Sequence, residues 1–430
     1  MTIIQDHELR YALANELHAR PFPALSAPCF AAFVAIKRPC DAAGRDRAED
    51  LAHLVTLLDR FGAHHPAEGA NHYFGEIGKH HIKWEQHTEF VTYTIFGEGN
   101  ADTPFDPKAF DVFPADWLAA APGVRVTSAL IRVERMPGLE QMREKIDTWF
   151  VPESVAASSV LDGAAVVAGD FRIDAGGHMR FAVFAGEDIT ARRVGRVVTR
   201  IAEIETYKAM SMLGLARARG VQARLGDIED ELSALVRGLG LGAGGERHET
   251  ELGELLHLAS ELESFNAQTS FRFGATEAYE AIVADRIRVL REQRWDGRQT
   301  NHEFMMRRFD PAMRTVKSVA RQIDDMAARA MRAAELLRTR VDVERSAQNQ
   351  RLLESMNRRA DLQLRLQETV EGLSVVAISY YAVSLLAYLV DPLAYEFGID
   401  KLWAKAALVI PVVLAVWLIG RLVRRKLIHK

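Results

Sequence analysis

The stretch Gly372-Leu-Ser-Val-Val-Ala-Ile-Ser-Tyr-Tyr-Ala-Val-Ser-Leu-Leu-Ala-Tyr-Leu-Val390 decides the fold, because it contains no charged residue. A hydrocarbon core about 30 Å thick is crossed by about 20 helical residues, so this stretch can span a bilayer. A second apolar segment follows, in which Lys405 can reach the headgroups and Pro411 is tolerated within a membrane helix. The sequence therefore predicts a transmembrane hairpin over 370–423, with spans at about 370–390 and 402–423. The alternative is a buried apolar hairpin in a soluble core.

Charge on either side of the spans predicts their orientation. Arginines precede the first span and the tail 424–430 is basic, whereas the turn at about 391–401 is mainly acidic. Basic residues favour the cytoplasmic side, so both termini are expected in the cytoplasm of a cell with the hairpin in its inner membrane and the turn outside. The N-terminus lacks a basic segment followed by an apolar run, so no signal peptide is expected. Cys29 and Cys40 should then be reduced thiols.

Composition bounds the remaining possibilities. The chain has 430 residues, which predicts two or three domains at roughly 150 residues each. Apolar residues make up 48% and charged residues 26%, so global disorder is excluded. A net charge of −4 argues against a dedicated nucleic-acid binder. Two cysteines exclude a disulfide framework and a Cys-rich metal site.

Residues 1–187 alternate between strand-like and helix-like patterns, which predicts a cytosolic mixed domain of the α+β or α/β class. A helix is expected within Asp6–Ala19, ending before Pro21. Residues 82–96 read as one long strand. The other expected strands are 30–36, 73–77, 124–133, 164–173 and 179–184, and the other expected helices are 48–61 and 139–150.

Residues 188–369 predict a helical stalk. Helices are expected at about 188–215, 221–237, 249–265 and 276–294, with a flexible Gly-rich loop at 238–245. That loop is no P-loop, because no Gly-Lys-Ser/Thr follows it. From Ala312 to Glu371 there is neither Gly nor Pro. A ladder with alternating steps of three and four predicts a coiled-coil seam, packed on helices of the same chain, of other subunits, or of both; it comprises Val316, Val319, Ile323, Met326, Ala330, Ala333 and Leu337.

A second ladder passes from the stalk into the first span without a break. It comprises Asn349, Leu353, Met356, Ala360, Gln363, Gln367, Val370, Ser374, Ala377, Tyr381, Ser384 and Tyr388. Its polar members should not face lipid. One interpretation is a pore around an oligomer axis, lined by hydroxyls and amides that suit a hydrated divalent cation. The other, preferred here, is helix packing through small and hydroxyl residues.

Four stretches resemble a bacterial family of uncharacterised, membrane-anchored proteins that is known only as a domain of unknown function. They are Glu16-Leu-His-Ala-Arg-Pro-Phe22, Trp84-Glu-Gln-His-Thr-Glu-Phe90, Glu203-Ile-Glu-Thr-Tyr207 and Gln367-Glu-Thr-Val-Glu-Gly-Leu-Ser374. This resemblance implies membrane anchoring and no known activity.

The layout also resembles the CorA-type magnesium channels, which are pentamers with a cytosolic α/β domain, a long helix leading into the first span, a second span and a basic tail. The Gly-Met-Asn signature expected after the first span is absent, and Tyr388-Leu-Val-Asp-Pro392 stands there instead. The resemblance therefore covers the layout and not the magnesium signature, and layout does not determine function.

Two groups in the N-terminal part are candidate sites. Glu16, His18 and Arg20 lie around the end of the first predicted helix, where they could form a small acid–base or anion site; favourable interaction with the helix dipole is the structural alternative. On a strand, Glu85 and His87 would share a face with Glu89, and such ligands could bind a divalent ion. Lys83 would share that face too, so a solvated charged surface is preferred.

The sequence contains no recognisable catalytic motif, so we do not expect an enzyme, and it identifies no cofactor. It predicts a membrane-anchored homo-oligomer that acts as a scaffold or sensor through a cytosolic binding domain. The alternative is a CorA-like cation channel or transporter with a pore lined by the first span. The expected partners are the lipid bilayer, further copies of the chain and, for the channel, a divalent cation, but no nucleic acid.

Overall fold

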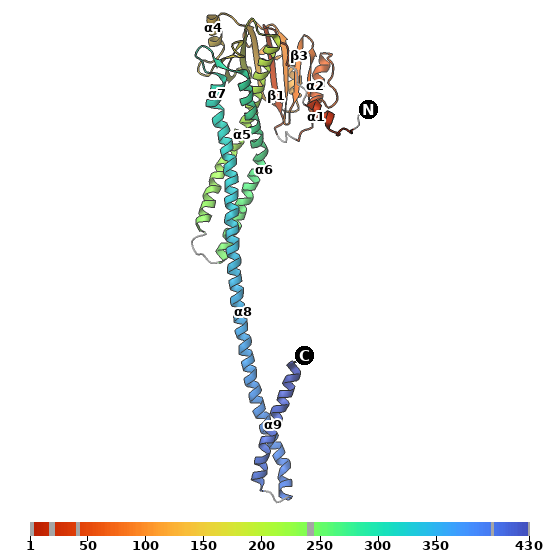
Figure 1. The fold of residues 1–430 in the computed structure, drawn as a ribbon, viewed down its shortest axis with the longest axis vertical. Coiled ribbons are helices and arrows are strands. Elements are labelled where there is room, and N and C mark those ends of the chain that lie inside the picture. Colours follow the sequence, from red (N-terminus) through yellow and green to blue (C-terminus); the bar gives the residue numbers. More distant parts are fainter. Residues whose placement is uncertain (1–3, 17–21, 40–43, 239–244, 397–399, 429–430) are drawn as a thin grey trace. The chain divides into compact units, whose positions relative to one another are not determined.

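The computed structural model describes residues 4–16, 22–39, 44–238, 245–396 and 400–428. The chain divides into two compact units. The first comprises Met1–Gly238 and Glu254–Ala333, and the second comprises Leu239–Gly253 and Ala334–Lys430. The predicted mixed fold, with an N-terminal sheet and a long C-terminal helix, is confirmed (Figure 1). The predicted boundaries at 187, 369 and 423 stay predictions.

Within the described residues of the first unit, nine strands form one sheet with the order β2-β3-β4-β1-β5-β8-β7-β6-β9. The β5–β8 pair is parallel and the other pairs are antiparallel. The edge strand β9 follows the two long helices Ala191–Gly238 and Gly245–Leu290 in the sequence, whereas the other eight strands precede them. The sheet therefore contains segments from both ends of this unit. The strands are β1 (Cys29–Lys37), β2 (His72–Ile77), β3 (His80–Gln86), β4 (Phe90–Glu98), β5 (Val124–Arg135), β6 (Ala156–Val160), β7 (Ala165–Ile173), β8 (Met179–Ala185) and β9 (Gln293–Arg294).

The prediction of a single strand over 82–96 is wrong, because this segment forms a hairpin. The strand β3 ends at Gln86 and β4 begins at Phe90, and the backbone N–H of His87 donates to the Phe90 carbonyl across the turn at 2.9 Å. The turn contains no Gly or Pro, so the sequence carries no turn signal at this point.

One face of the sheet holds the main hydrophobic core. Short helices cover this face: α2 (Arg47–Arg60), the 3₁₀ helix Pro107–Phe110, α3 (Ala115–Ala119) and α4 (Leu139–Trp149). Trp84 and Tyr93 project from the strands into this core, where they meet Leu54 of α2 and Trp117 of α3. The preceding helix α1 (Arg10–Glu16) lies within the predicted range.

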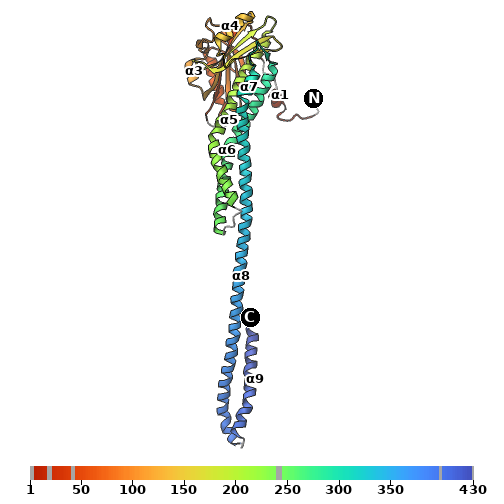
Figure 2. The same cartoon turned by 90° about the vertical axis from the view of Figure 1, so that its left-hand side faces the viewer.

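The opposite face of the sheet is covered by long helices. The helix α5 (Ala191–Gly238) packs on β1, β5 and β8, and it runs beside α6 (Gly245–Leu290) and the start of α8 (Asp310–Glu396) in both views (Figures 1 and 2). A short helix, α7 (Asn301–Arg308), precedes α8. The first ladder is buried along its whole length within the chain, whereas the coiled-coil seam and any contact with other subunits stay predictions. Cross-helix bonds include Gln322 to Glu229 of α5 and Lys317 to Glu280 of α6.

Two predicted helix breaks are absent. The helix α5 continues through Gly220, because one internal glycine costs only about 1 kcal/mol relative to alanine and Ala218 and Val221 beside it are buried. The helix α6 continues between 265 and 276, where Thr269 and Thr276 donate their hydroxyls to carbonyls of their own helix at 2.7 and 2.8 Å. The predicted Gly-rich loop at 238–245 lies mostly outside the described residues.

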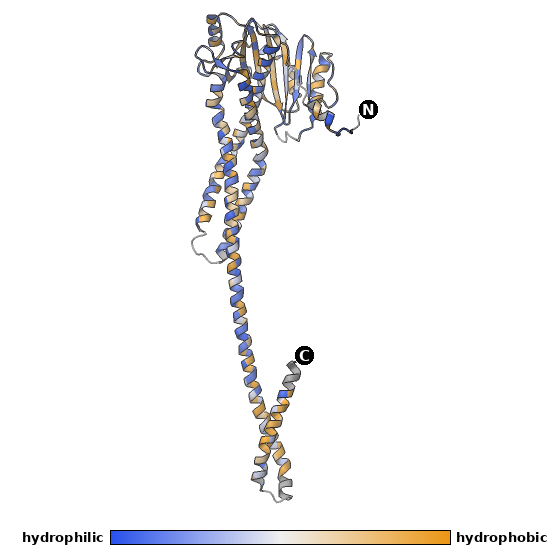
Figure 3. Ribbon diagram, viewed as in Figure 1, coloured by the Kyte–Doolittle hydropathy of each residue, from blue (hydrophilic) through white to orange (hydrophobic). Residues whose placement is uncertain are grey.

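The second unit contains the end of α8 and the helix α9 (Lys401–Ile428), which accommodates Pro411. Two helices, with windows of mean hydropathy 2.0, are long and apolar enough to cross a membrane. Figure 3 shows apolar residues gathered on these two segments. Nearly all of the large apolar side chains of these segments whose burial is described are exposed in the isolated chain.

Candidate functional site

A polar wall lies on the face of the sheet that α5 covers. Two rows of paired residues cross the neighbouring strands β3, β4 and β1. In one row Thr94 of β4 stands between Phe33 of β1 and Lys83 of β3. In the next row Thr92 of β4 pairs with Glu85 of β3. Because residues two apart on a strand point to the same side, these polar side chains share one face.

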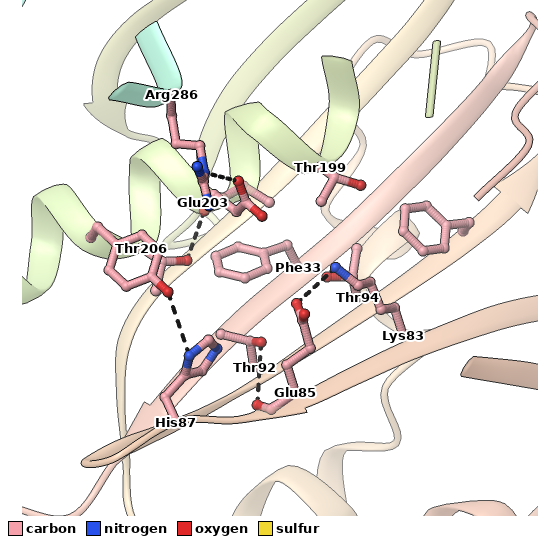
Figure 4. Close-up of a pocket in the computed structure, with 13 residues that line it drawn as sticks. Phe33, Lys83, Glu85, His87, Thr92, Thr94, Thr199, Glu203, Thr206 and Arg286 are labelled. Carbon is pink, nitrogen blue, oxygen red and sulfur yellow. Dashed lines mark hydrogen bonds and ion pairs between the residues drawn. The ribbon is translucent and has the colours of Figure 1, made fainter. Parts of the chain in front are cut away.

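Helices supply the facing wall. Thr199, Glu203, Thr206 and Tyr207 of α5 follow the spacing that places residues on one side of a helix, and Arg286 projects from α6. Together the two walls enclose a cavity of about 230 Å³ (Figure 4). This is below the roughly 300–1,000 Å³ of pockets that hold drug-sized ligands, so the cavity suits a small polar molecule.

Acid–base pairs lie on both walls of the cavity. On the sheet side, the Lys83 ammonium is 2.8 Å from the Glu85 carboxylate, although the lysine is only 8% exposed. On the helix side, the Arg286 Nε donates to Glu203 Oε2 at 2.6 Å, and Arg200 donates to the same oxygen at 2.9 Å. Both signs of charge are therefore present on each wall.

Hydroxyl groups complete the lining. The Thr206 hydroxyl donates to the Ala202 carbonyl of its own helix at 2.7 Å. Thr199 is 5% exposed, and its hydroxyl has no hydrogen-bond partner among the described residues. A buried hydroxyl without a partner costs about 1–3 kcal/mol. The cavity lining therefore contains a hydroxyl group that no described residue engages.

The β3–β4 turn closes one end of the cavity. The His87 ring stacks on Phe90 at 4.2 Å between centroids, and its Nδ1 lies 3.5 Å from the Tyr207 hydroxyl. Glu89 is fully buried and accepts from both terminal nitrogens of Arg272 and from the Tyr279 hydroxyl at 2.9 Å. Burial, with the nearby Glu89 carboxylate, raises the pKa of Tyr279. The turn is thus anchored to both long helices.

The cavity joins two of the stretches that support the family resemblance. Trp84–Phe90 supplies Glu85 and His87, and Glu203–Tyr207 supplies the opposite wall. A model of the family described as "Protein of unknown function (DUF3422)" matches residues 5–427. The chain belongs to this family. A search of the curated proteins found no match. The DUF3422 match spans both units, so the cavity and the two apolar helices lie within the family's extent.

The structure separates the predicted metal ligands. Glu85 is paired with Lys83, whereas His87 and Glu89 lie in the turn, and Glu89 is bonded to Arg272. The three do not share the face of one strand, because β3 ends at Gln86. No group of three or more His, Cys, Asp or Glu side chains that could hold a metal occurs in the described parts of the chain.

The other predicted N-terminal site cannot be placed as a unit. Glu16 is the last residue of α1, and His18 and Arg20 lie outside the described residues. The neighbouring Phe22 is described, and its ring lies under the guanidinium carbons of Arg196 and Arg200 at 5.5 and 5.4 Å from its centroid.

The side chains of the polar stripe differ in whether their polar groups are already hydrogen-bonded within the helix. Ser374 and Ser384 donate to carbonyls four residues earlier in α8, at 2.8 and 2.9 Å, so their hydroxyls are satisfied within the helix. Tyr381 and Tyr388 are exposed in the isolated chain. Gln363 and Gln367 are exposed as well.

A different face of α8 lies toward α9. Ser379 is 5% exposed and Val412 is 9% exposed, and the two helices cross in Figure 1 and lie side by side in Figure 2. Ser379 lies off the stripe in the spacing of the sequence. Ser374, Tyr381 and Tyr388 of the stripe stay exposed beside this contact, whereas Ser384 is partly buried.

The sequence analysis missed Thr199, Arg286 and the polar rows of β3 and β4. One signal was present, since Lys83, Glu85, Thr92 and Thr94 interrupt an otherwise apolar pattern at alternate positions. Arg286 carried no such signal, because its approach to Glu203 depends on how α6 packs against α5.

Proposed function

We propose that this chain is a membrane-anchored homo-oligomer whose cytosolic part is a ligand-binding domain, so that it acts as a sensor or scaffold at the inner membrane. The proposal includes no catalytic step. The end of α8 and α9 form the transmembrane hairpin, with both termini in the cytoplasm and the turn at about 391–401 outside. The length and apolar character of these two helices support the anchor, and the basic residues that flank them support the orientation.

The proposal of an oligomer rests on one observation, which is a change in side-chain burial along α8. The first ladder is packed against helices of the same chain, whereas further along the helix Leu353 is 61% exposed and Met356 is 63% exposed. This segment precedes the apolar span, so water would surround it in a single chain. Burying one such side chain stabilises an assembly by about 1.5–3 kcal/mol. The second ladder therefore provides a contact for further copies of α8.

The native mass of the detergent-solubilised chain tests this contact. We expect an oligomer that Leu353→Asp and Ala360→Asp dissociate, because each places a carboxylate in the apolar seam. Ala347→Asp is the matched control, since Ala347 is also exposed but lies on the opposite side of the helix. A wild-type monomer, or an oligomer that neither ladder variant affects, would contradict the proposal.

A CorA-like cation pathway is the second candidate. It is favoured by the stripe of Ser374, Tyr381, Ser384 and Tyr388, of which Ser374 and both tyrosines are exposed in the isolated chain and Ser384 is partly buried. The internal bonds of Ser374 and Ser384 argue for the packing role instead. Flux of a divalent cation into reconstituted liposomes tests the pathway. Flux that Ser384→Trp does not reduce would remove the stripe from consideration as a pore lining.

A further inference from the structure

We infer that the cavity between the sheet and α5 binds a small zwitterion of the α-amino acid class. This inference identifies the ligand of the binding domain in the proposed function and rests on that proposal for its biological role. The ligand would contact both walls at once, the sheet through β3 and β4 and the helices through α5 and α6.

Charge balance carries the first step. Among the residues that line the cavity, Lys83 and Arg286 are cationic and Glu85 and Glu203 are anionic, with one of each sign on each wall (Figure 4). Arg200, which also bonds Glu203, is not part of this lining. A cavity built for an anion would have a surplus of cations, and a cavity built for a cation would have a surplus of carboxylates. A ligand with one carboxylate and one ammonium can place each charge beside an opposite charge while the total stays neutral.

Hydrogen-bonding chemistry carries the second step. A carboxylate accepts charge-assisted bonds from lysine or arginine, and an ammonium donates three bonds to carboxylates and hydroxyls. The Thr199 hydroxyl is buried without a partner among the described residues, so it can take up one of these bonds. The ligand would thus satisfy a group whose burial otherwise destabilises the fold.

The size and the apolar lining of the cavity limit the kind of zwitterion that fits. The volume of about 230 Å³ holds several times the roughly 30 Å³ that one water occupies, yet it is too small for a nucleotide with its base, sugar and phosphates. Phe33 and Phe96 add an apolar part to the lining. A free amino acid with a compact apolar side chain meets both conditions.

Binding is tested on the full-length chain in detergent, by calorimetry and thermal shift with the twenty standard amino acids. Glucose and inorganic phosphate serve as neutral and anionic comparisons. We expect saturable binding of at least one amino acid and a higher melting temperature in its presence. The matching amine and the matching carboxylic acid, each lacking one charged group, should bind about ten- to hundredfold more weakly.

Variants locate the site. Arg286→Met and Thr199→Val should weaken binding of that amino acid, and Thr199→Val should do so without loss of fold because it is nearly isosteric. Arg60→Met is the matched control, since it removes an exposed ion pair with Asp116 on the other face of the sheet. The inference would be overturned if no amino acid bound, or if glucose or phosphate bound more tightly. It would also be overturned if both cavity variants bound the amino acid as tightly as the wild-type chain. The native mass is measured separately, so failure of the oligomer proposal is distinguishable from failure of this one.

Discussion

The buried Glu89 cluster should be the most sensitive polar contact of the first unit. Glu89 is fully buried, and it holds the β3–β4 turn through Arg272 and Tyr279 on α6, with Lys37 at 3.8 Å. Glu89→Gln keeps the shape of the side chain but removes its charge. It also turns an amide N–H₂ toward donors, so the buried Lys37 and the partly buried Arg272 lose their counter-charge. Breaking such a pair from one side costs about 3–5 kcal/mol in the free energy of unfolding.

The assay is urea denaturation followed by tryptophan fluorescence, because Trp84 lies buried in the strand that leads into this turn. The matched control is Asp116→Asn, an identical change of acid to amide in the exposed ion pair with Arg60, and it should shift the midpoint far less. Hydrogen exchange should also rise in the turn of the Glu89→Gln variant. Equal shifts of the urea midpoint for the two variants would refute the reasoning, because burial of the ion pair would then not determine the loss of stability.

Two further predictions concern packing and pH. Gly214→Ala would place a Cβ 2.1 Å from Thr276 Oγ1. It should therefore destabilise the α5–α6 contact by about 1–3 kcal/mol, with partial rescue by Thr276→Ala, and unchanged thermal stability of the single variant would contradict this. Burial lowers the pKa of His53, although the Trp117 carbonyl and Asp50 act in the opposite direction. The folded chain then binds fewer protons than the unfolded chain below about pH 6.5. Stability should fall as the pH drops below that value, and His53→Gln should make this fall shallower in melts at pH 7.5 and 5.5; equal slopes would count against it.

Local patterns predicted the type of most elements but not where each one is interrupted or continues. The alternation of apolar residues predicted most strands, and the absence of Gly and Pro from Ala312 to Glu371 predicted one long helix. The hairpin at 87–89 was missed because its turn contains neither residue type. The breaks expected in α5 and α6 did not occur, because packing of the neighbouring residues outweighed weak local preferences.

The sequence by itself determined the mixed fold class, the apolar C-terminal helices and the two ladders along α8, because each follows from the spacing of neighbouring residues within one element. Only the tertiary structure decided which ladder is buried within the chain, which face of α8 meets α9, and where the polar cavity lies. The cavity brings Lys83, Glu203 and Arg286 together from three distant parts of the chain. Their meeting depends on strand order and helix docking, which arise from the sum of many weak long-range contacts and leave no periodic signature in the sequence.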